Sequence, residues 1–108
     1  MTKITFYQSE DGSFSGFDSQ DHAGYDVEGQ DIVCSAVSAL VINFVNSLDQ
    51  FTDDNYQVDV DQENARINVV FTEKLSAEGS LLLNSLILGL SGIEEEQEQY
   101  LDVIFKEV

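Results

Sequence analysis

Alternation of apolar and polar residues at the start of the chain predicts a β-hairpin. In the stretch KITFYQS, Ile4 and Phe6 alternate with polar neighbours, and Phe14 and Phe17 do the same a few residues later. An Asp-Gly pair lies between the two runs, and such pairs favour the tight turns of hairpins. Two antiparallel strands are therefore expected before the first helix.

A helix is predicted from Ile32 to about Leu48, because the apolar residues there recur at intervals of three and four. Asp31 directly precedes this stretch and is a residue type that favourably caps the start of a helix. The apolar positions that share the helical spacing are Val33, Val37, Val41, Phe44, Val45 and Leu48.

Three further alternating stretches predict three more strands. YQVDVD and ARINVVF form a second hairpin around a polar turn at residues 62–64, and EQYLDVIFKEV closes the chain as a strand. With a second helix before the last strand, the element order is ββαββαβ. This order indicates one α+β domain over residues 1–108, an antiparallel-rich sheet covered by two helices, and it leaves the strand order open.

The second helix is predicted to be apolar around most of its circumference. It opens at Ser76, contains the run LLLNSLILGL and ends near Gly92. A helix of this kind needs cover on nearly every side, which favours a homodimer whose second copy covers one side. The alternative is that the sheet and the first helix cover both faces. The apolar residues concerned are Leu81, Leu82, Leu83, Leu86, Ile87, Leu88 and Leu90.

The composition is that of a globular protein of the cell interior. Hydrophobic residues make up 43% of the chain and charged residues 23%, which excludes a disordered chain. Asn84 and Ser85 interrupt the apolar run of the second helix, and the N-terminus lacks the apolar core of a secretory signal, so no membrane contact is expected. A single cysteine cannot form an internal disulfide, so the expected compartment is the reducing cytoplasm.

The net charge of the chain bears on which classes of molecule it can bind. Four Lys and Arg residues stand against 21 Asp and Glu residues, which gives a formal net charge of -17. Such a protein repels phosphate backbones, so direct binding to nucleic acid is disfavoured. The same charge would attract a basic partner, although an acidic surface also serves solubility alone.

No cofactor or metal ion is expected. The stretch DVDQEN has the alternating carboxylates that open a calcium loop, but Asn64 stands where that loop needs Gly and Val70 where it needs Glu. The acidic run EEEQE after the second helix is typical of solvated surface. The sequence contains no phosphate loop, dinucleotide fingerprint or paired-cysteine zinc site.

The only histidine, His22, and the only cysteine, Cys34, lie twelve positions apart across a glycine-bearing loop. If Asp31 caps the helix, Cys34 lies in its first turn, where unpaired N–H groups and the helix dipole stabilise a thiolate. A histidine across the loop could then act as proton acceptor and donor. The alternative is packing, because Cys34 shares the apolar stripe of the helix and free cysteines are often buried.

The stretch HAGYDVEGQDIVCSAVSAL resembles the signature of the ribosomal-processing cysteine proteases, a family of small bacterial proteins. The shared pattern is a Gly-His-Ala step, a Gly-bearing loop and Asp-Ile-Val-Cys-Ala-Ala-Val-Ser at a helix start. The match is continuous over about 19 residues, and the ββαββαβ layout fits the family along the whole chain. Asp21 departs from the Gly that the family usually has there, and Ser35 departs from Ala.

The resemblance implies a cysteine endopeptidase with Cys34 as nucleophile and His22 as general base. It further implies that the substrate is a bacterial large-subunit ribosomal protein, the twenty-seventh, whose N-terminal extension is cut after a pair of aromatic residues. Ribosomal proteins are basic, so the acidic surface gains a possible role in attracting substrate. The resemblance also implies a homodimer, and it implies neither cofactor nor metal.

Several residues are candidates for supporting roles. The N–H groups of Cys34 and Ser35 could hold an oxyanion at the helix start. Ser38 lies one turn below Cys34, where it could bond to Cys34 or to the loop, or simply to its own helix backbone. Gly24 and Gly29 suggest a mobile loop that holds His22 away until substrate binds. The candidates for orienting His22 are Asp21, Asp26 and Asp31, the last with helix capping as its alternative role.

A second function class fits the same charge and predicted dimer. An acidic, non-enzymatic dimer could bind a basic ribosomal protein during ribosome assembly. Only the histidine and cysteine pair separates this interaction module from a protease.

Overall fold

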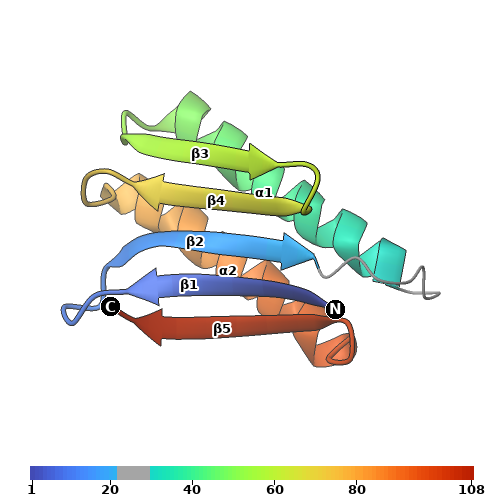
Figure 1. The fold of residues 1–108 in the computed structure, drawn as a ribbon. Helices are drawn as coiled ribbons and strands as arrows, with labels where there is room; N and C mark the ends of the chain where they lie inside the picture. Colours follow the sequence, from blue (N-terminus) through green and yellow to red (C-terminus); the bar gives the residue numbers. More distant parts are fainter. Residues whose placement is uncertain (22–29) are drawn as a thin grey trace.

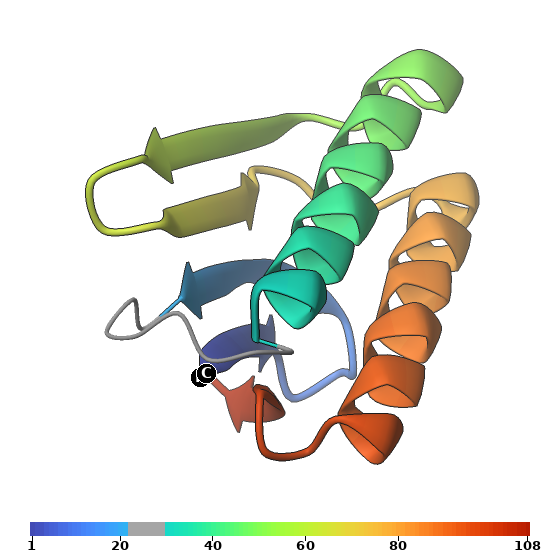
Figure 2. The same ribbon diagram turned by 90° about the vertical axis from the view of Figure 1, so that its right-hand side faces the viewer.

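The computed structural model describes residues 1–21 and 30–108, and these form two layers (Figure 1). One layer is a five-stranded sheet, and both helices lie against a single face of it (Figure 2). The predicted α+β class and element order are confirmed. The elements are β1 (Thr2–Gln8), β2 (Phe14–Asp21), α1 (Gln30–Phe51), β3 (Tyr56–Asp61), β4 (Arg66–Phe71), α2 (Ala77–Glu96) and β5 (Leu101–Glu107).

The strand order, which the sequence left open, is β3-β4-β2-β1-β5. The β1–β2 and β3–β4 pairs are the two predicted hairpins, and both are antiparallel. β4 then joins β2 in antiparallel fashion, whereas β5 runs parallel to β1. The sheet is therefore mixed but antiparallel-rich, with β2 at its centre.

The core lies between the sheet and the two helices. Alternate residues of the strands, among them Ile4, Phe6 and Phe17, point into it and are fully buried. The helices contribute residues at intervals of three and four, which is the spacing that places them on one side of a helix. Those residues are Val33, Val37, Val41, Phe44 and Leu48 from α1, and Leu83, Leu86 and Leu90 from α2.

Helix α1 is longer than the periodicity predicted. It begins at Gln30 and runs to Phe51, so Asp31 is its second residue. The predicted capping position of Asp31 is therefore wrong. By length and mean hydropathy, 1.6, the stretch Ile32–Phe51 could also span a membrane, a property that core helices share. In this fold its apolar face packs on the sheet and α2.

Helix α2 begins as predicted and ends later. Ser76 is its N-cap, and the side-chain oxygen of Ser76 accepts a hydrogen bond from the N–H of Gly79. The helix continues past Gly92 to Glu96, so most of the acidic run is helical. Glu94 is not simply solvated, because its carboxylate accepts a 2.5 Å hydrogen bond from the N–H of Val103 at the start of β5.

The leucines of α2 divide into covered and uncovered positions. Leu83, Leu86 and Leu90 are buried, but Leu81 and Leu88 remain 70% and 76% exposed. The latter two lie seven residues, about two turns, apart and thus on one side of the helix. The sheet and α1 therefore do not cover the whole helix, and an apolar strip faces outward.

Replacement by alanine should change the free energy of unfolding in opposite directions at two glycines of α2. Gly92→Ala should raise the free energy of unfolding by about 0.5–1 kcal/mol, since nothing lies within 4 Å of the added Cβ and alanine favours a helix. Gly79→Ala should lower it by about 1 kcal/mol or more, because its Cβ collides with the Asp54 carboxylate. That carboxylate holds the N–H and hydroxyl of Ser76 at 3.1 and 2.8 Å. Urea unfolding of both variants measures the two changes in free energy. Equal changes would contradict the close packing described around Gly79.

Candidate active site

Cys34 lies on α1 at the rim of a cleft of about 210 Å³. The cleft is bounded by the first turns of α1, by the ends of β1 and β2 where Thr2 and Asp21 pair, and by the β3–β4 hairpin. The cysteine side chain is half-buried, so its sulfur can be reached from the cleft. The apolar lining residues are Val37, Val60, Ala65 and Ile67, and the polar ones include Ser19, Ser38, Asp61, Gln62 and Arg66.

A hydrogen bond joins Cys34 to Asp21 in this cleft. The thiol of Cys34 donates a hydrogen bond of 3.0 Å to Asp21 Oδ2. The other oxygen of the same carboxylate accepts a 3.3 Å hydrogen bond from the hydroxyl of Thr2, which is its cross-strand partner. Both carboxylate oxygens are therefore engaged by groups of the cleft.

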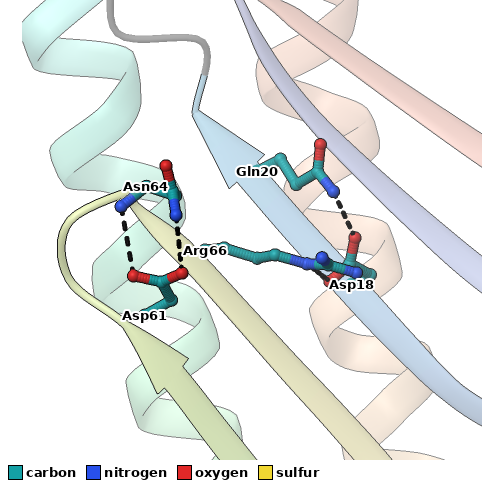
Figure 3. Close-up of polar contacts among 5 residues, drawn as sticks. All are labelled: Asp18, Gln20, Asp61, Asn64 and Arg66. Carbon is teal, nitrogen blue, oxygen red and sulfur yellow. Dashed lines mark hydrogen bonds and ion pairs between the residues drawn. The ribbon is translucent and has the colours of Figure 1, made fainter.

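The turn of the β3–β4 hairpin forms the wall opposite α1. Asp61 accepts hydrogen bonds from both the backbone and the side chain of Asn64, at 3.2 and 2.7 Å (Figure 3). These bonds lower the pKa of Asp61 below its ordinary value. Ala65 then adopts a φ of 49°, and its carbonyl accepts a 3.0 Å hydrogen bond from the N–H of Asp21. The turn is thereby fixed to the end of β2.

An ion pair supports the same wall from the open face of the sheet. Arg66 Nε donates to Asp18 Oδ1 at 2.8 Å across the β4–β2 pair, and Gln20 donates to the other oxygen at 3.0 Å (Figure 3). The Asp18 side chain is only 7% exposed although it lies on the open face. The hydrogen bond raises the pKa of Arg66, so this guanidinium remains charged.

Comparison with known proteins identifies the family. The family model described as "Cysteine protease Prp" matches residues 1–102. The chain belongs to the Prp family of cysteine proteases. It is 28% identical over 107 residues to the ribosomal processing cysteine protease Prp of Bacillus subtilis, covering 95% of this chain and 96% of that one. The Prp of Staphylococcus aureus is 23% identical over 106 residues, covering 98% and 100%.

Solved structures of the S. aureus Prp have the same fold. The complex with a substrate peptide superposes with a TM-score of 0.92 at 22% identity, over 98% of this chain and all of that one. The complex with a covalently linked product peptide gives 0.88 at 23% identity over the same shares. The chain is thus a cysteine protease by family, with the family's fold along nearly its whole length.

The structure places some of the predicted Prp site residues and not others. His22, Gly24, Asp26 and Gly29 lie outside the described residues. Asp31 is helical, Ser35 is exposed, and Ser38 lines the cleft beside Cys34. Asp21, predicted as one candidate for orienting His22, contacts the sulfur of Cys34.

The predicted oxyanion donors are not supported by the start of α1. Because the helix begins at Gln30, Cys34 is its fifth residue, and only the first four N–H groups of a helix lack an acceptor within it. The N–H groups of Cys34 and Ser35 point toward carbonyls four residues earlier. The positive end of the helix dipole still lies about one turn away.

Sequence reasoning missed the contribution of the β3–β4 hairpin to the cleft. The Ala65 carbonyl reaches Asp21, and the Arg66 side chain reaches Asp18, only because β4 pairs with β2. These residues are more than 40 positions apart in the chain. No local pattern signals such a pairing, whereas Thr2 follows from the predicted first hairpin.

Removal of the Arg66 side chain should destabilise this wall. Arg66→Ala should lower the free energy of unfolding, because the Asp18 carboxylate, which is only 7% exposed, loses a charged donor. The same substitution in an Asp18→Asn background should cost clearly less. A double-mutant cycle by urea unfolding measures the difference. Equal losses in the two backgrounds would show that the ion pair contributes nothing.

Proposed function

We propose that this protease removes the N-terminal extension of a basic large-subunit ribosomal protein, the twenty-seventh, with Cys34 as nucleophile and His22 as general base. The observation that carries the proposal is the half-buried sulfur of the chain's only cysteine at the rim of a cleft. His22 follows directly on Asp21, whose carboxylate touches that sulfur. The names of the curated Prp relatives, ribosomal processing proteases, support the substrate class.

The chemistry needs only the protein's own side chains. His22 takes the proton of the Cys34 thiol, and the sulfur attacks the scissile carbonyl to form a tetrahedral intermediate. His22 then gives its proton to the leaving amine, and the C–N bond breaks to leave a thioester on Cys34. Water, deprotonated by His22, attacks the thioester and releases the acid product and the free thiol. The covalently linked product peptide in the S. aureus relative is in keeping with such an intermediate.

The net charge of the protein and the residues that line the cleft suit a basic substrate with aromatic side chains. Val37, Val60 and Ile67 give the cleft apolar walls that can take the aromatic side chains before the cut. Asp61 stands at the rim with its carboxylate ionised at neutral pH. The net charge of -17 adds long-range attraction for a basic protein. The proposed partner is thus protein, not nucleic acid, and the proposed compartment is the cytoplasm, where ribosomes are assembled.

The interaction module is the weaker alternative. It accounts for the acidic surface equally well, but it gives no role to the cysteine that the cleft leaves accessible. Membership of a family of cysteine proteases favours catalysis over binding alone.

We further propose that the protease works as a homodimer through α2. Leu81 and Leu88 give the helix an exposed apolar strip, and burying two leucines would remove unfavourable contact with water. A second copy of the chain can supply an equal strip across a two-fold axis. The apolar surfaces would then cover one another.

Substitution of the two catalytic residues tests the protease proposal. Cys34→Ala should abolish cleavage of a peptide carrying the aromatic-containing extension, while leaving its fold intact. His22→Ala should be inactive or nearly so, and the double variant about as slow as either single variant, since the two residues act as one unit. Cleavage kinetics and thermal unfolding of all four proteins provide the measurement. Turnover that survives in Cys34→Ala would refute the assignment.

Sedimentation equilibrium tests the dimer. At micromolar concentration the wild type should behave as a species of twice the 12.0 kDa chain mass. Leu81→Glu with Leu88→Glu should give the single-chain mass, because charges would be buried at the interface. Ile42→Glu is the matched control, an exposed apolar residue of α1 that should leave the dimer intact. A wild-type protein of single-chain mass would exclude this assembly.

A further inference from the structure

The carboxylate of Asp21 stands where it can control the reactivity of Cys34. Asp21 Oδ2 and Cys34 Sγ are 3.0 Å apart, and the contact lies inside the cleft that both residues line. The Asp21 Oδ1 atom accepts from the buried Thr2 hydroxyl at 3.3 Å. The carboxylate is thus held from one side and faces the sulfur with the other.

Strand geometry builds this contact. Phe17 and Asp21 lie four positions apart on β2, so their side chains point to the same, helix-covered face of the sheet. The N–H of Asp21 is bonded to the Ala65 carbonyl, and Thr2 lies opposite in register on β1. The end of β2 therefore has neighbours on both sides, and its last side chain is directed toward α1.

A contact this short between sulfur and carboxylate oxygen requires a shared proton. A thiolate and a carboxylate at this separation would repel each other. In this contact the Cys34 thiol is the donor and the Asp21 carboxylate is the acceptor. The arrangement at rest is therefore a thiol that is hydrogen-bonded to the carboxylate.

We propose that Asp21 is a positioning residue that holds Cys34 as a hydrogen-bonded thiol in the free enzyme and so restrains the nucleophile until substrate binds. The inference rests on the proposed function for the assignment of Cys34 as nucleophile. Entry of a peptide chain into the cleft separates the carboxylate from the sulfur, and the thiol proton then passes to His22.

Among the residues that the structure describes, the other charged residues lining the cleft, Asp61 and Arg66, have partners of their own. Arg66 donates to Asp18 on the open face of the sheet, and Asp61 accepts from Asn64 within the hairpin turn. The positive end of the α1 dipole lies about one turn from Cys34 and favours the thiolate. The Asp21 carboxylate is in direct contact with the sulfur and disfavours the thiolate, so it opposes the effect of the dipole. Its removal should therefore shift thiolate formation to lower pH.

Alkylation by iodoacetamide gives a direct test, because Cys34 is the only cysteine of the chain. The alkylation rate would be measured from pH 5 to pH 10 for the wild type, Asp21→Asn and Asp61→Asn. Asp21→Asn keeps the size of the side chain and an acceptor but loses the charge. Its profile should move to lower pH by about one unit, which makes it roughly tenfold faster at pH 7.

Asp61→Asn is the matched control, since it removes one negative charge from the same cleft without touching the sulfur contact. Its profile should move far less. Identical profiles for the wild type and Asp21→Asn would overturn the proposal, and so would an equal shift in Asp61→Asn, which would indicate a general field effect. Asp21→Gly repeats the test if thermal unfolding shows that Asp21→Asn does not fold.

Peptide cleavage by the same proteins separates this inference from the proposed function. If the proposed function holds, kcat/KM of Asp21→Asn should rise relative to the wild type toward low pH, together with its alkylation rate. If no protein cleaves the peptide, the proposed function fails, while the alkylation profiles still decide the role of Asp21. A shifted alkylation profile with an unshifted cleavage profile would refute the restraint on catalysis.

Discussion

The packing of Phe17 is the constraint on which the arrangement of this site depends. Phe17 is fully buried at the centre of the sheet, and its ring lies 5.3 Å from Phe6 of β1, 5.7 Å from Phe44 of α1 and 6.4 Å from Phe71 of β4. One side chain thereby ties together both neighbouring strands and the helix. Aromatic contacts of this kind fix the face that β2 turns toward α1, because a slip by one residue would expose Phe17.

The contact between Asp21 and Cys34 follows from that packing. Asp21 lies four residues beyond Phe17 on the same face of β2, and Cys34 lies ten residues before Phe44 on α1. Phe17 of β2 and Phe44 of α1 are in contact in the core. From there β2 continues to Asp21 and α1 extends back to Cys34, so these two residues meet in the cleft. Packing of the core thus determines where Asp21 and Cys34 meet, although no core residue takes part in their contact.

The sequence predicts this fold well wherever the decisive interactions are local. Both hairpins follow from alternation and turn residues, and Ser76 is identified as a cap because its side chain bonds within one turn. The start of α1 is predicted less well, since Gln30 carries no apolar or capping signal. The end of α2 is also predicted less well, because Gly92 keeps helical geometry and the helix continues to Glu96.

The site is predictable in its residue types but not in its contacts. Cys34 and His22 stand out because each occurs once, and the motif around them resembles a known family. The wall formed by the β3–β4 hairpin depends on the pairing of β4 with β2, which is a tertiary choice that no local pattern contains. From the sequence, Asp21 is a departure from the family's Gly and one of three candidates for orienting His22. Its contact with sulfur becomes visible only when β2 is seen to end beneath α1.

The contact between Asp21 and Cys34 bears on the reactivity expected of the proposed nucleophile. A cysteine near a helix start is expected to be activated, since the dipole is equivalent to about half a positive charge there. This influence falls off within the first turn, and Cys34 is the fifth residue of α1. A full negative charge at 3.0 Å outweighs a partial positive one at a greater distance. Under the role proposed for Asp21, the contact favours the protonated thiol, which is less susceptible to oxidation than the thiolate.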